Sequence, residues 1–149
     1  MYITILQWNA CGLAGHGNEL KQFMEHDRQL HDVLFIQETL LKQTNKFTIP
    51  GYNIIRQDRQ GNRTHGGLAT LVRNNLNYIE FDKPDDVESI TVRVKTENKY
   101  IVIANPYLSP NDSIIKDKFA KLFANNNKMP TTPFGVVRCI TAEAKCWMN

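Results

Sequence analysis

Two apolar segments of the chain each end in a side chain that can bind a metal ion or a phosphate. Residues 5–13 read ILQWNACGL and turn polar at Asn9, and residues 32–40 read DVLFIQETL and turn polar at Gln37 and Glu38. Mg²⁺ prefers oxygen ligands and is often held by one or two carboxylates with a substrate phosphate, so Glu38 is a candidate metal ligand. The Asn9 amide can bind a phosphate oxygen or orient a metal-bound water. Taken singly, each residue also fits a plain role, as a turn asparagine or a surface glutamate.

A third candidate, Tyr107, lies in NPYLSP just beyond another apolar segment. Its phenol can donate to a phosphate oxygen as negative charge develops, although an aromatic residue packing over the sheet edge is the simpler alternative. Gly66 and Gly67 precede a further apolar segment, where paired glycines allow a bulge or a close approach of the backbone. We interpret His65, which precedes them, as a loop residue and not as a catalytic one.

Arginines gather in one window of the sequence. Residues 56–73 contain four arginines and one acid, Asp58, so the window carries the whole net charge of +3 while the other charges cancel. A guanidinium offers a planar fork of donors that suits phosphate, which makes these arginines candidate nucleic-acid contacts. The alternative is an ordinary solvated loop. The four candidates are Arg56, Arg59, Arg63 and Arg73.

The first elements must bring Asn9 and Glu38 together. The sequence predicts, in order, a strand at 2–8, a helix within 15–30 that Asn18 caps, and a strand at 32–36. A strand–helix–strand unit implies parallel strands. Parallel strands place both carboxyl ends at one edge of the sheet, and ligands of open α/β sheets bind at such edges.

Several further strands follow before a second helix. The predicted fold is therefore α/β with large mixed sheets packed face to face, and not a doubly wound nucleotide-binding fold. Proline cannot donate to a ladder, so the strand that begins at residue 100 is expected to stop at Asn105-Pro106. The predicted strands are 51–57, 66–73, 76–81, 88–95 and 100–105, and the second helix is 112–127.

Composition sets broader limits. With 149 residues, of which 42% are hydrophobic and 22% charged, the chain is long enough for one ordinary domain. No apolar run approaches the roughly 20 residues of a membrane-spanning helix, and the first run looks like a strand rather than a signal peptide. The three cysteines, Cys11, Cys139 and Cys146, suggest no disulfide framework. We therefore expect an intracellular protein, nuclear or cytoplasmic, without a membrane partner.

Five motifs occur together in the order typical of one family. They are ILQWNACGL, DVLFIQETLL, IPGYNIIRQDR, HGGLATLVRNNL and IVIANPYLSP, and the resemblance they carry covers roughly residues 3–127. The chain thus resembles the endonuclease/exonuclease/phosphatase family, and most closely the apurinic-type endonuclease domains of non-LTR, jockey-like retrotransposons. The resemblance implies a four-layer α/β sandwich that hydrolyses phosphodiester bonds with Mg²⁺ or Mn²⁺. In retroelements such a domain nicks target DNA and accompanies a reverse transcriptase domain.

The resemblance also implies roles for the candidate residues. Asn9 matches the family's amide near phosphate and metal, Glu38 matches its metal-binding glutamate, and Tyr107 matches the tyrosine beside the scissile phosphate. The arginines from residue 56 onward match the beginning of the family's DNA-facing loop. We therefore expect the catalytic set Asn9, Glu38 and Tyr107, with Glu38 and Asn9 also at the metal.

The chain departs from the family pattern in its last part. Where some members have an acid two residues after the first asparagine, this chain has Cys11. The family's Gly-Asp-Phe-Asn, expected after residue 127, and its Asp-His pair do not occur in the sequence. We expect residues 1–128 to form a truncated domain, an incomplete sandwich with helices on one face of a mixed sheet, and residues 129–149 to form a divergent tail.

Those elements would position and activate the attacking water, so we expect the chain to be inactive or severely impaired as a DNA endonuclease. Three alternatives remain open from the sequence. One is a non-catalytic nucleic-acid-binding module, and another is a different phosphodiesterase or phosphatase of the same superfamily. The third is an unrelated α/β domain in which the motifs occur by coincidence.

Overall fold

The structure is a computed structural model, and it describes most of the first 107 residues and one later strand. The described residues are 3–26, 31–58, 61, 66–80, 88–97 and 100–107, with the backbone alone at 137–142. The predicted helix at 112–127, the side chains of Arg59, Arg63 and His65, and the rest of the tail lie outside the described residues.

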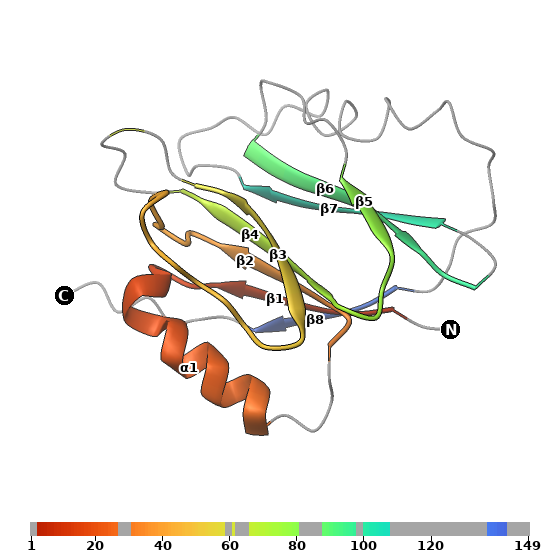
Figure 1. The fold of residues 1–149 in the computed structure, drawn as a ribbon, viewed down its shortest axis with the longest axis horizontal. Coiled ribbons are helices and arrows are strands. Elements are labelled where there is room, and N and C mark those ends of the chain that lie inside the picture. The colour runs from red at the N-terminus through yellow and green to blue at the C-terminus, as the bar shows by residue number, and fades with distance from the viewer. Residues whose placement is uncertain are drawn as a thin grey trace.

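The first sheet is mixed and contains five strands in the order β3-β4-β2-β1-β8 (Figure 1). β1 pairs in parallel with both β2 and β8, whereas β4 pairs antiparallel with β2 and β3. The parallel arrangement of the first two strands is therefore as predicted. The strands are β1 (Ile3–Asn9), β2 (Val33–Gln37), β3 (Tyr52–Gln57), β4 (Leu68–Arg73) and β8 (Val137–Ala142).

The second sheet is antiparallel and smaller. β5 (Tyr78–Glu80), β6 (Glu88–Lys95) and β7 (Tyr100–Tyr107) follow one another in both sequence and space. Alternation of apolar and polar residues in β6 places Ile90, Val92 and Val94 toward the first sheet, as the period-two pattern predicts.

Apolar side chains fill both faces of the first sheet. One cluster, which includes Ile3, Val33 and Val92, lies between the two sheets. The other, which includes Leu6 and Leu34, lies beneath helix α1 (Leu13–His26), which covers the outer face (Figure 1). The described residues therefore form a helix layer and two sheet layers. Burial on both faces explains why β1 and β2 are almost continuously apolar.

Helix α1 begins earlier than the sequence suggests. It starts at Leu13 rather than near Asn18, because the carbonyl of Gly12 accepts the N–H groups of Gly15 at 3.3 Å and His16 at 3.2 Å. The predicted cap therefore lies within the helix. Leu13, Leu20 and Met24 form its buried stripe.

Strand β7 continues past the point where it is predicted to stop. Pro106 pairs in register with Ser89, and the strand ends only at Tyr107. β7 is an edge strand of the three-stranded sheet, and a proline is tolerated there because its missing N–H can face away from the ladder. The prediction was therefore wrong by two residues, and the extension carries Tyr107 on a strand instead of a loop.

The tail contributes one strand to the fold. The backbone of β8 pairs with β1 from Ile3↔Val137 to Trp8↔Ala142, so β1 is flanked on both sides. Among the described helices, none is both long and apolar enough to span a membrane.

Candidate metal and phosphate site

The segments that follow β1 and β2 remain hydrogen-bonded to each other after the last paired residues of the strands. Asn9 is in register with Gln37, and beyond them Gly12 donates its N–H to the carbonyl of Glu38 at 2.9 Å. Leu13 likewise donates to the carbonyl of Thr39 at 2.9 Å. These backbone bonds fix the segment after Asn9 beside the segment that carries Glu38. We refer to this end of the sandwich as the rim.

The rim contains strained backbone. Cys11, Glu38 and Leu40 have φ angles of 45°, 51° and 52°, and they are the non-glycine residues with positive φ among those described. For residues with a β-carbon this conformation costs about 1 kcal/mol or more each, and it persists only where the surroundings enforce it. Strain of this kind gathers at functional sites, and here it coincides with the candidate metal ligand.

Tyr107 reaches the rim from the second sheet. Its hydroxyl donates to Oε1 of Glu38 at 3.0 Å, and both side chains are half-buried. Two predicted residues that are 69 positions apart therefore meet directly. The contact orients the carboxylate and leaves Tyr107 within reach of whatever binds beside Glu38.

Asn9 lies at the same rim, but its amide turns toward its own loop. Oδ1 of Asn9 accepts the N–H of Cys11 at 3.2 Å, which is an Asx turn that helps to hold the strained Cys11. The structure thus brings Glu38 and Tyr107 together and places Asn9 on the adjacent strand end.

Cys11 differs from expectation. It is disulfide-bonded. The sequence suggested no disulfide framework, and with this cysteine bonded, cysteine usage no longer argues for a reducing compartment. Sγ of Cys11 lies 3.8 Å from Oε2 of Glu38. A disulfide sulfur has no proton to donate, so we interpret this as a packing contact.

The donor set fits a hard cation only in part. Glu38 supplies a carboxylate and Asn9 an amide, which are oxygen ligands of the kind that Mg²⁺ and Mn²⁺ accept. Within the described residues no group of three or more His, Cys, Asp or Glu side chains could hold a metal ion. A cation bound beside Glu38 would therefore have to take most of its ligands from water and phosphate oxygens.

Two residues that sequence reasoning missed join the sheets beside the rim. Asn105 is 0% exposed, and its amide nitrogen donates to the carbonyl of Ala69 at 3.1 Å and to Oγ1 of Thr70 at 3.3 Å. Gln37 donates from Nε2 to the carbonyl of Pro106 at 2.8 Å. A signal was present, because Asn105 occupies an inward position two residues before Tyr107, where the strand pattern calls for an apolar side chain.

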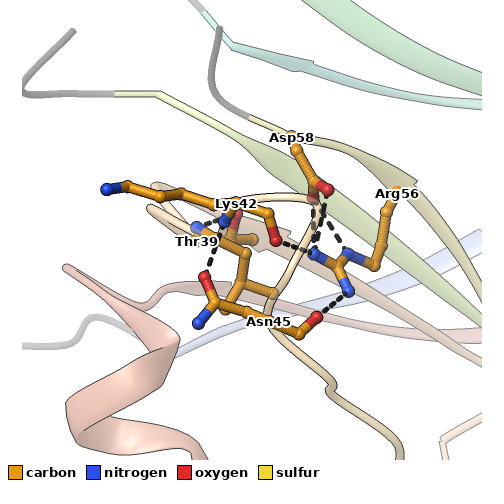
Figure 2. A network of polar contacts seen from close by, with 6 residues as sticks. Thr39, Lys42, Asn45, Arg56 and Asp58 are labelled. Carbon is orange, nitrogen blue, oxygen red and sulfur yellow. Dashed lines mark hydrogen bonds and ion pairs between the residues drawn. The ribbon is translucent and has the colours of Figure 1, made fainter. Parts of the chain in front are cut away.

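Arg56, one of the predicted nucleic-acid contacts, makes its described bonds within the protein. Its guanidinium donates to both carboxylate oxygens of Asp58 at 2.9 Å, to the carbonyl of Asn45 at 2.8 Å and to that of Lys42 at 3.1 Å (Figure 2). The side chain is only 20% exposed. The guanidinium predicted to bind phosphate therefore binds the loop that follows Glu38.

The other predicted arginines divide between the described and undescribed residues. Arg73 lies 3.5 Å from Oδ1 of Asp32 and is half-buried, at the opposite end of β4 from the rim. Arg59 and Arg63 lie outside the described residues. Of the two described arginines, Arg56 binds Asp58 and a loop and Arg73 lies beside Asp32, so neither guanidinium contacts Glu38.

Similarity to known proteins gives independent information on the chain. No protein-family model matches the chain. It is similar to the RNA-directed DNA polymerases from the mobile element jockey of Drosophila melanogaster, 28% identical over 120 residues, and of Drosophila funebris, 25% identical over 126 residues. These alignments include 78% and 82% of this chain but only 13% of each polymerase.

Solved structures agree with these relatives. The endonuclease domain of TRAS1, a telomere-specific non-LTR retrotransposon, matches with a TM-score of 0.58 and 20% identity over 93% of this chain and 58% of that one. The fold is that of the endonuclease/exonuclease/phosphatase family. The AP endonuclease LMAP from Leishmania major, another structure with this family fold, matches with a TM-score of 0.54 and 23% identity over 72% of this chain and 40% of that one. The resemblance to apurinic-type and jockey-like retrotransposon endonucleases is thus confirmed, and this chain spans less than two thirds of each of these relatives.

Proposed function

We propose that the rim is the metal- and phosphate-binding half of a retroelement-type DNA endonuclease site. The observation that supports this most is the bond from the Tyr107 hydroxyl to the Glu38 carboxylate, because it unites two sheets at a strained turn. The similarity to the jockey polymerases supports DNA as the substrate and a reverse transcriptase as the functional partner. We propose a nuclear or cytoplasmic site of action, in agreement with a DNA substrate.

In this proposal the chain's own residues bind and orient the scissile phosphate. Glu38 would hold Mg²⁺ or Mn²⁺, and the ion would supply Lewis-acid stabilisation of the phosphoryl oxygens. Tyr107 holds the carboxylate in one orientation and can turn its hydroxyl to a phosphate oxygen once the carboxylate is engaged. Asn9, on the neighbouring strand end, offers an amide to the same phosphate.

Activation of the attacking water needs groups that these 149 residues do not show. The sequence contains neither Gly-Asp-Phe-Asn nor an Asp-His pair. We therefore propose that this polypeptide, assayed alone, binds the ion and phosphate weakly and does not hydrolyse DNA at a useful rate. Removing members of a catalytic unit commonly costs several orders of magnitude.

Line broadening by paramagnetic Mn²⁺ tests the site even when affinity is low. In the ¹⁵N-labelled chain, substoichiometric Mn²⁺ should broaden the amide signals of Thr39 and Cys11 first, and Glu38→Gln should abolish the effect. Glu25→Gln, at an exposed helical position, is the matched control and should behave as wild type. Equal broadening in wild type and Glu38→Gln would overturn the metal site.

A nicking assay tests the second part of the proposal. Supercoiled plasmid incubated with the chain and Mg²⁺ should stay supercoiled. Robust nicking that disappears in Glu38→Ala would show that the chain holds a complete catalytic set and that the proposed impairment is wrong.

A further inference from the structure

Glu88 lies beside the rim in a place that no candidate role explains. It is the first residue of β6 and is paired in register with Tyr107, so both side chains project from the same face of the second sheet. Its Oε1 accepts the N–H of Gly67 at 2.8 Å, and the side chain is half-buried. Glu88 therefore links the second sheet to the segment that leads into β4.

Gly66 and Gly67 are shaped to this carboxylate. Their φ angles are 102° and 88°, which residues with a β-carbon rarely adopt. A β-carbon on Gly66 would lie 3.4 Å from both carboxylate oxygens of Glu88. The glycine pair thus allows the backbone to approach Glu88 closely enough for the hydrogen bond to form.

The same two glycines hold the turn that contains Glu38. The carbonyl of Gly67 accepts the N–H of Thr39 at 3.1 Å, and the carbonyl of Gly66 accepts the N–H of Leu40 at 3.2 Å. Thr39 is 1% exposed and lies between the positive-φ residues Glu38 and Leu40. Two backbone hydrogen bonds therefore attach the strained turn to the Gly66–Gly67 segment, and Glu88 holds that segment in place.

We propose that Glu88 is a positioning residue for Glu38. It holds Gly67, the glycine carbonyls hold Thr39 and Leu40, and these fix the backbone from which the Glu38 carboxylate meets Tyr107. The role rests on the proposed metal site and adds the residue that sets its geometry. Since Oε1 already accepts a backbone N–H, Glu88 acts through reach and acceptance of that bond, not through its charge at the ion.

Substitutions at Glu88 separate a role in accepting the Gly67 hydrogen bond from a role of the carboxylate charge. Glu88→Gln keeps an acceptor oxygen at the same reach but removes the charge, whereas Glu88→Asp keeps the charge but shortens the side chain by one methylene. Glu88→Ala removes both. Loss of an orienting group behind a metal ligand typically weakens metal binding by about tenfold or more.

The experiment measures Mn²⁺ broadening of the Thr39 amide signal in the full chain. We expect Glu88→Gln to match wild type, and Glu88→Ala and Glu88→Asp to need about tenfold more Mn²⁺ for equal broadening. If glutamine is as harmful as alanine, or if alanine is harmless, the positioning role is refuted. If the alanine variant does not fold, the order of the glutamine and aspartate variants decides the question, because a charge effect would reverse it.

A metal-free measurement keeps this inference separate from the proposed function. Without any ion, the amide resonances of Thr39 and Leu40 should move in Glu88→Ala and stay in place in Glu88→Gln. A failure of Glu38 to affect Mn²⁺ broadening would refute the metal site alone, whereas unmoved Thr39 and Leu40 resonances would refute the positioning role alone.

Discussion

Replacement of Asn105 by alanine should destabilise the fold more than any ordinary strand substitution. The amide is fully buried and donates to the carbonyl of Ala69 and to the hydroxyl of Thr70, while its oxygen receives a longer bond of 3.5 Å from Gln37. Two neutral hydrogen bonds contribute about 1 kcal/mol each, and a buried hydroxyl that loses its partner costs about 1 kcal/mol more. We therefore expect a loss of about 3 kcal/mol in the free energy of unfolding, a large part of the total for a domain of this size.

Urea unfolding followed by circular dichroism measures this loss. With a urea dependence of about 2 kcal/mol per molar, the midpoint should fall by about 1.5 M. Asn53→Ala is the matched control, because Asn53 lies on β3 but is exposed, and its free energy of unfolding should change by less than about 0.5 kcal/mol. Asn105→Asp keeps the side-chain size but cannot donate to Ala69, so it should be at least as harmful as alanine.

The reasoning depends on hydrogen bonding and not on side-chain volume. A midpoint for Asn105→Ala that coincides with that of Asn53→Ala would refute it. So would an aspartate variant as stable as wild type at neutral pH, because that result would make the donated bonds dispensable.

Two further predictions concern charged and ionisable groups. Arg56→Lys should lower the free energy of unfolding by about 2 kcal/mol in urea titrations, because lysine cannot reproduce the paired bonds to Asp58 and the bonds to two loop carbonyls. Arg73→Lys, which affects one 3.5 Å ion pair, should lower it by less than about 1 kcal/mol. Equal losses in the two variants would contradict the structural role assigned to Arg56. Burial, and then the charge of Glu80, raise the pKa of Tyr78 above 10.0, so the stability that the protonated phenol contributes is complete below pH 10 and is lost as pH rises through the folded-state pKa. The free energy of unfolding should therefore fall less steeply above pH 10 in Tyr78→Phe than in wild type. Equal slopes in the two proteins would refute this.

The sequence was sufficient for those parts of the site that depend on strand order. Asn9 and Glu38 follow apolar strands joined by a helix, so their place at one edge follows from the parallel pairing. Tyr107 could be assigned to the site through the resemblance, although the predicted strand end two residues before it was wrong.

Side-chain partners across the sandwich could not be predicted in the same way. The bond from Glu88 to Gly67 needs the register of β6 against β7 and the stacking of the two sheets, and local sequence patterns specify neither. Arg56 illustrates the same limit. The arginine cluster looked like a phosphate-binding surface because charge can be counted from the sequence. The carbonyls of Lys42 and Asn45, which the Arg56 guanidinium binds, come from a loop more than ten residues away.

Among the described residues, the hydrogen bonds that Glu88, Gln37, Asn105 and Tyr107 make between the two sheets lie at or beside the rim. Apolar contacts, which are not directional, fill the space between the sheets along the rest of their length. Directional contacts therefore join the two sheets along the candidate site. Small movements of the second sheet against the first should separate the sheets at the end opposite the rim and leave the distance between Tyr107 and Glu38 nearly constant. The candidate site then lies away from the part of the sandwich that moves.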